Sequence, residues 1–300
     1  EKAIATIIIE LFKEISEIKN LSLNSFYNKI FFLRDGHVGL DFSSATSAIE
    51  MCLWDIKAKR ENKPLSNILS KNPKKKVSVY ANTWSEKLPN CEALTIRAID
   101  LLSKGYGGIK IYPLQNRSIE EAVSCISKLR NKIGYETPLM LDLASPQDPN
   151  ISLKLASLIK EFKPYWFEEP IDGQSTRLLA SIKKQTGLKI VTGEKQFGLQ
   201  HFIETLAANA ADILNPDIAG VGGIIDMIEI AKLAEKKDVL VSPHCWNSMS
   251  IAASAMLHFC ASNINTDMAE IYPEYIPPVS YTHLRAHETL RYLVCRLLLE

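Results

Sequence analysis

Residues 165–171 read YWFEEPI, and this stretch decides the fold because it joins two features that rarely occur together. Three large apolar residues (165–167) are typical of a buried strand. They run directly into Glu168 and Glu169, and Pro170 ends the strand. A carboxylate is costly to bury unless it pairs with a cation or binds a metal. The stretch therefore predicts a strand that delivers a carboxylate to a functional site.

The same pattern recurs along the chain at a period of roughly 25 to 30 residues, with helical stretches between the β-rich runs. The eight runs are VSVYANT (77–83), GIKIYPL (108–114), PLMLDL (138–143), YWFEEP (165–170), KIVTGE (189–194), ADILNPD (211–217), VLVSPHC (239–245) and MAEIYPE (268–274). Alternating strands and helices predict parallel strands joined by helical crossovers. Eight units predict a closed (β/α)₈ barrel over residues 76–278, with an open doubly wound sheet as the alternative.

Two of the helical stretches carry clear boundary signals. Ser118 is a candidate N-cap, Glu121 its capping-box partner, and Gly134 a stop signal. Residues 222–237 place apolar side chains at helical spacing. Both stretches are therefore expected to form helices between strands.

Residues 1–75 differ from the rest of the chain because their pattern is helical throughout. They predict helices near 2–18 and 44–60, followed by a link rich in proline and lysine. We therefore expect a separate helical unit that precedes the barrel.

A titratable residue lies at or near the C-terminal end of each strand from the second to the eighth. These residues are Lys110, Asp142, Glu168, Glu194, Asp217, His244 and Glu270. The C-terminal ends of the strands in a parallel barrel open onto one face, where the active sites of such barrels lie. Any one of these residues could be structural, but their common phase predicts a single site.

Three of these residues are carboxylates on consecutive strands, namely Asp142, Glu168 and Glu194, and we expect them to converge on one point. Ligand sets made of oxygen alone suit a hard cation, Mg²⁺ before Mn²⁺ or Ca²⁺. Because side chains alternate along a strand, Glu169 is expected to point away from Glu168, toward a neighbouring lysine.

The composition excludes several classes of partner. Apolar residues make up 46% of the chain and charged residues 23%, and the formal net charge is +1. This balance gives no reason to expect a nucleic acid or a membrane surface as partner, and no apolar run reaches the roughly 18 residues of a membrane span. The six cysteines show no C-x-x-C pair and no metal-binding spacing. We interpret them as reduced thiols of a cytoplasmic protein.

The strand motifs resemble a known family. GYGGIKIYPL, LMLDLAS, YWFEEPI, IVTGE, LNPDIAGVGGI and VSPHCW, in this order, resemble the barrel of the enolase superfamily, specifically its mandelate racemase branch. The earlier ATSAIEMCLWDIKAK resembles the last helix of that family's N-terminal α+β capping domain. The resemblance covers about residues 1–278. It implies a capping-domain remnant over residues 1–75 and a catalytic barrel over 76–278.

The resemblance also implies roles for the strand-end residues. Asp142, Glu168 and Glu194 would bind Mg²⁺, and His244 with Asp217 would form the dyad of the mandelate racemase branch. Lys110 would help to hold the substrate carboxylate, and Glu270 would match a family acid near the end of strand eight. The muconate lactonising branch has a lysine near the end of strand six, which residues 211–224 lack. These matches favour the mandelate racemase branch.

Family members remove a proton α to a carboxylate, and cations stabilise the charge that develops. Enolase-superfamily sites are a standard example of a lysine or histidine base beside Mg²⁺. His244 is the natural base here, and Asp217 would orient its ring and stabilise the imidazolium. The substrate would be a small carboxylate.

One departure from the family pattern favours a particular reaction. The family's second strand commonly ends in Lys-x-Lys, whose second lysine is a base, but here Tyr112 stands in that place. With an ordinary pKa near 10, a tyrosine is a poor base at neutral pH. A racemase needs a base on each face of its substrate, so a single base predicts a dehydratase. His244 could then serve as both base and acid while an acid sugar becomes a 2-keto-3-deoxy acid.

Three alternatives remain open at this point. A racemase or epimerase of a 2-hydroxy acid would need Tyr112 to act as a base. A barrel aldolase would use Lys110 as a Schiff base, although a carboxylate triad has no part in that chemistry. A non-catalytic or truncated relative would bind metal without reacting.

The family resemblance and the chain ends raise further expectations. Family members are often homo-oligomers, and we expect the same of this protein. The first part of the capping domain is expected to lie outside this chain. The tail over residues 279–300 resembles translated adapter DNA, so we predict that it is artefactual.

Overall fold

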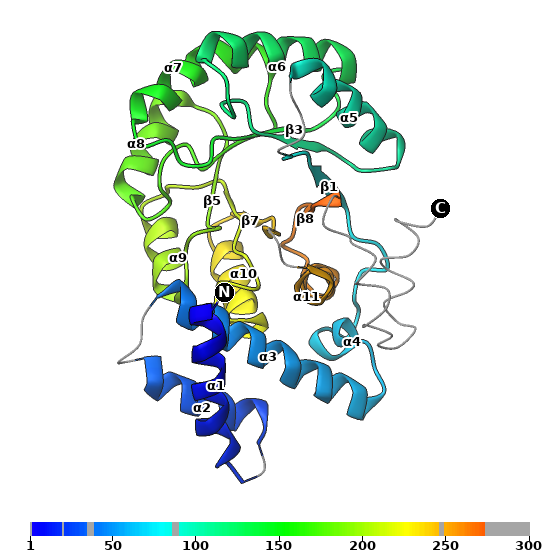
Figure 1. Ribbon diagram of the computed structural model, residues 1–300, viewed down its shortest axis with the longest axis vertical. Helices are drawn as coiled ribbons and strands as arrows, with labels where there is room; N and C mark the ends of the chain where they lie inside the picture. Colours follow the sequence, from blue (N-terminus) through cyan, green and yellow to red (C-terminus); the bar gives the residue numbers. More distant parts are fainter. Residues whose placement is uncertain (1, 20, 35–38, 86–89, 246–248, 274–300) are drawn as a thin grey trace.

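Eight parallel strands form one curled sheet surrounded by helices in the computed structural model (Figure 1). The structure describes residues 2–19, 21–34, 39–85, 90–245 and 249–273. The predicted artefactual tail, 279–300, lies outside these residues.

Each β-rich run of the sequence contains one strand. The strands are β1 (Val79–Asn82), β2 (Ile109–Ile111), β3 (Leu139–Asp142), β4 (Trp166–Glu168), β5 (Ile190–Thr192), β6 (Ile213–Leu214), β7 (Leu240–Val241) and β8 (Ala269–Ile271). The helices that follow them in order are α5 (Cys91–Ser103), α6 (Ile119–Ile133), α7 (Pro149–Ile159) with the 3₁₀ helix η1 (Lys160–Phe162), α8 (Thr176–Thr186), α9 (Gly198–Ala207), α10 (Ile224–Glu235) and α11 (Met249–Ser262). The capping box of Ser118 and Glu121 is present at the start of α6, and Gly134 ends that helix, as predicted.

The strand order shows a barrel and not an open doubly wound sheet. The strands follow the order β7-β6-β5-β4-β3-β2-β1-β8, and every pair of neighbours is parallel. The two ends of this order also meet. The Val241 amide donates to the Asn265 carbonyl (3.0 Å), and the Asp267 amide donates to the Val241 carbonyl (2.9 Å). These bonds join β7 to the segment that leads into β8, so the ring closes.

Apolar side chains fill the barrel below the face on which the strands end. This inner cluster consists of Tyr80, Met140, Trp166, Val191, Ile213 and Met268. The rings of Tyr80 and Trp166 meet edge to face, with their centroids 5.1 Å apart. Because this layer excludes water from beneath, polar groups above it are buried and open toward one side only.

The N-terminal helices form a unit beside the barrel (Figure 1). They are α1 (Lys2–Ser16), α2 (Leu23–Arg34), α3 (Leu40–Glu61) and α4 (Leu65–Leu69). The predicted helices near 2–18 and 44–60 correspond to α1 and α3, whereas α2 and α4 were not predicted. Within the described segments, no helix is long and apolar enough to cross a membrane.

A buried carboxylate attaches α3 to the barrel. Glu50 accepts hydrogen bonds from the amides of Ile224 and Ile225, at the start of α10, and from the Trp54 indole (3.2 Å). Burial raises the pKa of Glu50, and the amide donors offset part of this effect. The positive end of the α10 dipole also favours a carboxylate there. Glu50 thereby fixes the N-terminal unit to the side of the barrel that follows β6.

We expect Gly223→Ala to break this attachment. Gly223 has φ +113°, and an added Cβ would lie 2.0 Å from Glu50 Oε2. Displacing Glu50 would leave a buried carboxylate and two amides unpaired, at a cost of about 3 kcal/mol or more. Urea unfolding would measure the loss. Gly187→Ala is the matched control because Gly187 also has positive φ (+62°) but open space around it. Its cost should be only about 1 to 2 kcal/mol, and equal losses would contradict a specific role for Glu50.

Candidate active site

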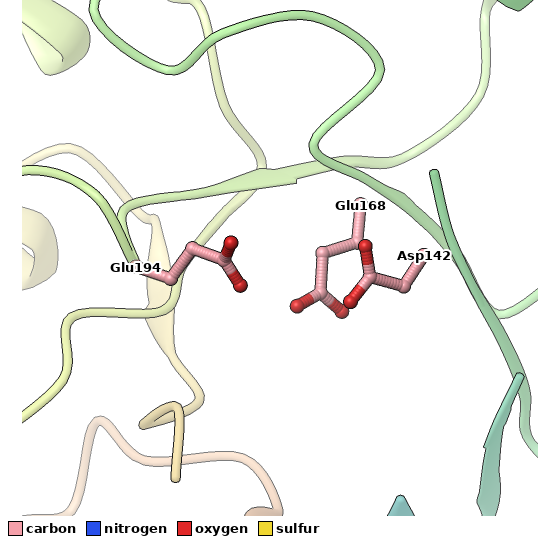
Figure 2. Close-up of side chains that lie close together, drawn as sticks. All are labelled: Asp142, Glu168 and Glu194. Atoms are coloured by element: carbon pink, nitrogen blue, oxygen red, sulfur yellow. The ribbon is translucent and has the colours of Figure 1, made fainter. Parts of the chain in front are cut away.

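The structure brings three carboxylates together at the C-terminal ends of neighbouring strands. Asp142 ends β3, Glu168 ends β4, and Glu194 follows β5. One oxygen from each lies within 4.8 Å of the others, and Figure 2 shows the three side chains pointing toward a common point. The register pairs Asp142 with Glu168 across the sheet, which sets these two side chains at one level.

The charges at this point fit a bound cation. The Lys110 Nζ lies 2.7 Å from Glu270 Oε1, 2.8 Å from Glu168 Oε1 and 3.3 Å from Asp142 Oδ2. A single buried ammonium thus faces several carboxylates, with Glu194 close by. Burying this excess of negative charge is costly unless a further cation balances it. The oxygen-only donor set suits Mg²⁺.

Neutral donors hold Glu168 in place. The Trp166 indole donates to Glu168 Oε2 (2.9 Å), and the Asn215 amide donates to Glu168 Oε1 (2.9 Å). Burial raises the pKa of Glu168 well above its usual value, and nearby Asp142 adds to the rise. Burial likewise raises the pKa of Glu194. A bound cation would reverse this trend by favouring the ionised carboxylates.

His244 lies between two carboxylates. Its Nδ1 is 2.8 Å from Asp217 Oδ2, and its Nε2 is 3.2 Å from Glu194 Oε2. Burial alone would lower the pKa of this imidazole, but Glu270, Glu194 and Asp217 together raise it to about 10. The contact with Asp217 fixes the ring and leaves Nε2 as the atom that can reach a substrate.

Tyr112 lies two residues beyond Lys110. Among the described residues, its phenol oxygen takes part in a single hydrogen bond. The Asn82 amide donates to this oxygen at 3.0 Å. Burial raises the pKa of Tyr112 well above its usual value, although Lys110 opposes the rise. Tyr112 is therefore neutral at physiological pH and is a poor base.

Lys110 is buried below the cleft instead of lining it. Burial alone would lower its pKa, but Glu168 and Glu270 raise the pKa well above the usual value. A Schiff-base lysine needs the opposite, a lowered pKa and access to the substrate. The aldolase alternative is therefore disfavoured. The expected contact of Lys110 with a substrate carboxylate stays a prediction.

A cleft of about 680 Å³ opens above these groups. Its lining includes Tyr112, Asp142, Glu194, Asp217 and His244, whereas Lys110, Glu168 and Glu270 lie beneath it. Leu40 and Ser44 of α3 also contribute, so the N-terminal unit forms part of the wall. The volume suits a small molecule.

Glu169 points away from Glu168, as its place in the strand predicted. Its carboxylate accepts hydrogen bonds from Thr192 (2.6 Å) and Ser145 (2.9 Å), and the Ser145 hydroxyl contacts Lys195 Nζ at 2.6 Å. Burial, with Glu194 nearby, raises the pKa of Glu169 to about 7. The expected lysine is thus Lys195, and the Ser145 hydroxyl bridges it to Glu169.

Two polar residues of the site were missed by the sequence analysis. Asn82 ends β1 and contacts both Tyr112 and Glu270, and Asn215 follows β6 and contacts Glu168. The strand-end pattern in the sequence was defined by titratable residues, and the side-chain amide of asparagine does not titrate. Extending the same rule to all polar strand-end residues would have found both.

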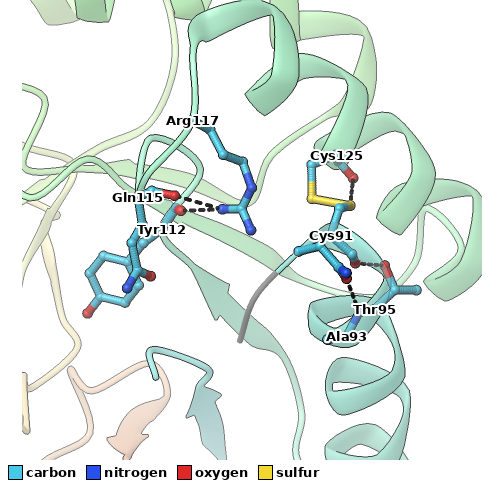
Figure 3. Close-up of a disulfide and its surroundings, with 8 residues drawn as sticks. Cys91, Ala93, Thr95, Tyr112, Gln115, Arg117 and Cys125 are labelled. Carbon is cyan, nitrogen blue, oxygen red and sulfur yellow. Dashed lines mark hydrogen bonds between the residues drawn. A yellow bond between two sulfur atoms is a disulfide. The ribbon is translucent and has the colours of Figure 1, made fainter. Parts of the chain in front are cut away.

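A disulfide lies beyond Tyr112. Cys91, at the start of α5, is bonded to Cys125 of α6, with a Cα–Cα distance of 5.5 Å. Figure 3 shows this bond beside Arg117, whose guanidinium binds the main-chain carbonyls of Tyr112 and Gln115. The interpretation of all six cysteines as reduced thiols is therefore wrong for this pair, because the fold sets two helix positions within bridging distance. Cys52, Cys245 and Cys260 are free, and Cys295 lies outside the described residues.

We expect reduction of this bond to lower stability. Cross-linking residues 34 apart in sequence removes unfolded-state freedom worth about 3 to 4 kcal/mol. Urea unfolding of Cys91→Ser/Cys125→Ser should show a loss of this size, and dithiothreitol should have the same effect on the wild type. Cys52→Ser, at an exposed free thiol, is the control and should change stability by less than about 0.5 kcal/mol. An unchanged double variant would mean that the bond does not form in solution.

Two family profiles match the chain. The profile described as Enolase C-terminal domain-like matches residues 94–292. The profile described as Mandelate racemase / muconate lactonizing enzyme, N-terminal domain, matches residues 5–70. The chain belongs to the mandelate racemase/muconate lactonizing enzyme family of the enolase superfamily. The first match runs past residue 279, where we predict an artefactual tail; that prediction concerns residues outside the described ones.

Family relatives of known name cover most of this chain. D-galactarolactone cycloisomerase of Agrobacterium fabrum is 30% identical over 88% of this chain and 68% of its own length. D-gluconate dehydratase of Thermoproteus tenax is 25% identical over 71% of this chain and 45% of its own length. Among solved structures, an enolase from Sargasso Sea environmental sequencing is 52% identical with a TM-score of 0.89, over 92% of this chain and 73% of that one. The chain therefore spans less than half of the length of the D-gluconate dehydratase.

Proposed function

We propose that this member of the mandelate racemase/muconate lactonizing enzyme family is a lyase that dehydrates an acid sugar to a 2-keto-3-deoxy acid. The observation that carries the proposal is the asymmetry of the cleft. His244, oriented by Asp217, is an imidazole that can exchange a proton, whereas Tyr112 is a neutral phenol. A site with one competent base suits elimination better than racemisation.

In the proposed reaction His244 Nε2 takes the proton α to the carboxylate. The electron pair of that C–H bond forms a C=C bond as the β-hydroxyl leaves. The hydroxyl takes up a proton, so one water is released, and His244 can supply that proton in a syn elimination. The resulting enol then loses its hydroxyl proton and gains a proton at the β-carbon, which gives the 2-keto-3-deoxy acid. Asp217 keeps the His244 ring in place throughout.

We propose Mg²⁺ as the cofactor, held by Asp142, Glu168 and Glu194. When bound, it would supply Lewis-acid stabilisation of the charge that develops on the substrate carboxylate. It would also offset the charge of Glu194, one of the carboxylates that raise the pKa of His244. This brings His244 closer to the neutral form that a base requires. Buried Lys110 and Glu270, which pair beneath the cleft, would set the net charge around the metal ligands.

The name of one relative supports this reaction, and the names of two support the class of substrate. Of the two curated relatives described above, one is named a D-gluconate dehydratase and the other a D-galactarolactone cycloisomerase. Both names refer to sugar-derived acids. We also propose a homo-oligomer, which size-exclusion chromatography would test. We propose a cytoplasmic location as well, which the Cys91–Cys125 disulfide does not favour and which cell fractionation would test.

Proton NMR in D₂O tests the proposed reaction. The protein would be incubated with Mg²⁺ and a panel of aldonates and aldarates. We expect the α-proton signal to disappear while a 2-keto-3-deoxy product with deuterium at the β-carbon appears. Exchange of the α-proton without elimination would instead indicate a racemase or epimerase. No change with any compound, despite Mg²⁺ binding, would favour a non-catalytic relative.

A further inference from the structure

Asn82 is a fully buried amide at the end of β1, beside the cleft but outside the family pattern described above. Its orientation is fixed by the main chain. The Trp84 amide donates to Asn82 Oδ1 at 2.8 Å, and a backbone N–H can only donate. The other side-chain atom must therefore be the nitrogen, which carries two hydrogens.

Both hydrogens of the Asn82 amide have acceptors. The Asn82 nitrogen lies 2.7 Å from Glu270 Oε1, which also accepts from Lys110 Nζ, and 3.0 Å from the Tyr112 phenol oxygen. The second Glu270 oxygen accepts from the Cys245 amide at 3.0 Å. Both hydrogens of the Asn82 amide are thus engaged, and the nitrogen that faces Tyr112 cannot accept a hydrogen bond from the phenol.

This arrangement dictates where the Tyr112 proton points. Because the phenol oxygen already accepts from Asn82, its own hydrogen must turn to another acceptor. Among the described residues no such acceptor contacts it, and Tyr112 lines the cleft. Figure 3 shows its ring turned away from Arg117, which holds the main chain of Tyr112 from the far side. The O–H therefore faces the space that a substrate would occupy.

We propose that Asn82 is a positioning residue that fixes Tyr112 as a hydrogen-bond donor to an oxygen of the substrate. Tyr112 then stabilises charge on that oxygen without giving up its proton. The identity of the substrate rests on the proposed function, but the direction of the hydrogen bond does not. A donor aimed at developing charge acts mainly on kcat.

A double-mutant cycle tests this proposal. Tyr112→Phe is expected to lower kcat by roughly 100-fold with little change in KM, as for loss of one such donor. Asn82→Asp replaces the amide donor by an acceptor that would draw the Tyr112 proton away from the cleft, and we expect a similar fall. If Asn82 acts through Tyr112, the double variant should be no worse than Tyr112→Phe alone. Multiplying effects would overturn the proposal.

A second variant and a second readout keep the test independent of folding and of turnover. Asn82→Leu should show the same non-additivity, and Mg²⁺ affinity and melting temperature would report whether each variant folds. With 3-fluorotyrosine incorporated, the ¹⁹F resonance assigned through Tyr112→Phe should shift in both Asn82 variants. An unmoved resonance would overturn the proposed contact even if no acid sugar reacts, whereas a shift without any turnover would contradict only the proposed reaction.

Discussion

His244→Asn is expected to lower kcat by at least about 1,000-fold, the typical scale for loss of a general base that also acts as an acid. Asparagine can keep a hydrogen bond to Asp217, but it cannot accept a proton. The site should otherwise hold its shape, because the Asp217 contact is the one that orients this side chain. Steady-state kinetics on the substrate found by NMR would measure the fall. Exchange of the α-proton in D₂O should disappear in the same variant.

His201→Asn provides the matched control. His201 lies on α9, where its Nδ1 is 2.6 Å from the Phe197 carbonyl, away from the cleft lining. Its replacement should leave kcat within a few-fold of the wild type. If His244→Asn kept exchange of the α-proton, another group would be the base, and the role proposed for Tyr112 would be reopened.

Glu168→Gln is expected to weaken Mg²⁺ binding by more than about 100-fold, since loss of a ligand should exceed the 10- to 100-fold cost of losing an outer partner. In the wild type, Mg²⁺ at 100 times its dissociation constant should stabilise the fold by about 2.7 kcal/mol. In the variant this stabilisation should fall to about 0.4 kcal/mol or less at the same concentration. Isothermal titration calorimetry and thermal unfolding with and without Mg²⁺ would measure both effects.

The metal-free variant should behave differently from an ordinary core mutant. Burial raises the pKa of Glu168, and nearby Asp142 and Glu270 add to the rise, so a neutral amide relieves repulsion. The amide nitrogen of glutamine cannot accept the hydrogen bonds that donors make to one of the two carboxylate oxygens, which opposes this gain. The melting temperature without Mg²⁺ should therefore stay close to that of the wild type. Glu229→Gln, at an exposed carboxylate that pairs with Lys232, is the control and should retain the full Mg²⁺ response. A variant that still binds Mg²⁺ normally would exclude Glu168 as a ligand.

The strands and the converging carboxylates were predictable because both follow from short-range rules. Each strand is an apolar run, and parallel strands end on one face, so Asp142, Glu168 and Glu194 had to approach one another once the barrel closed. The direction of Glu169 followed from the alternation of side chains along β4. None of these inferences needed a long-range contact.

Other features could not be predicted because they depend on long-range packing. Lys110 is the middle residue of β2, and only the packed barrel shows that its ammonium is enclosed by carboxylates from three other strands. The helix α2 buries Phe26 and Ile30, but it also carries Phe31 and Phe32 exposed (72% and 75%), so its sequence pattern gives no clear apolar face. The pairing of Cys91 with Cys125 follows from the packing of two helices, for which the sequence spacing gives no signal.

The positions of the site residues along the strand order have a consequence for how this barrel can change. The three clustered carboxylates lie on adjacent strands, β3 to β5. The Tyr112 phenol follows β2, and the His244 imidazole follows β7. The two groups that would contact the substrate's reacting atoms thus lie on either side of the carboxylate cluster. Each belongs to a different connection between strands. Either of these two residues can therefore be exchanged, by evolution or by an engineer, without rebuilding the carboxylate cluster, so new reactions are accessible through single-position changes on a scaffold that keeps its three carboxylates.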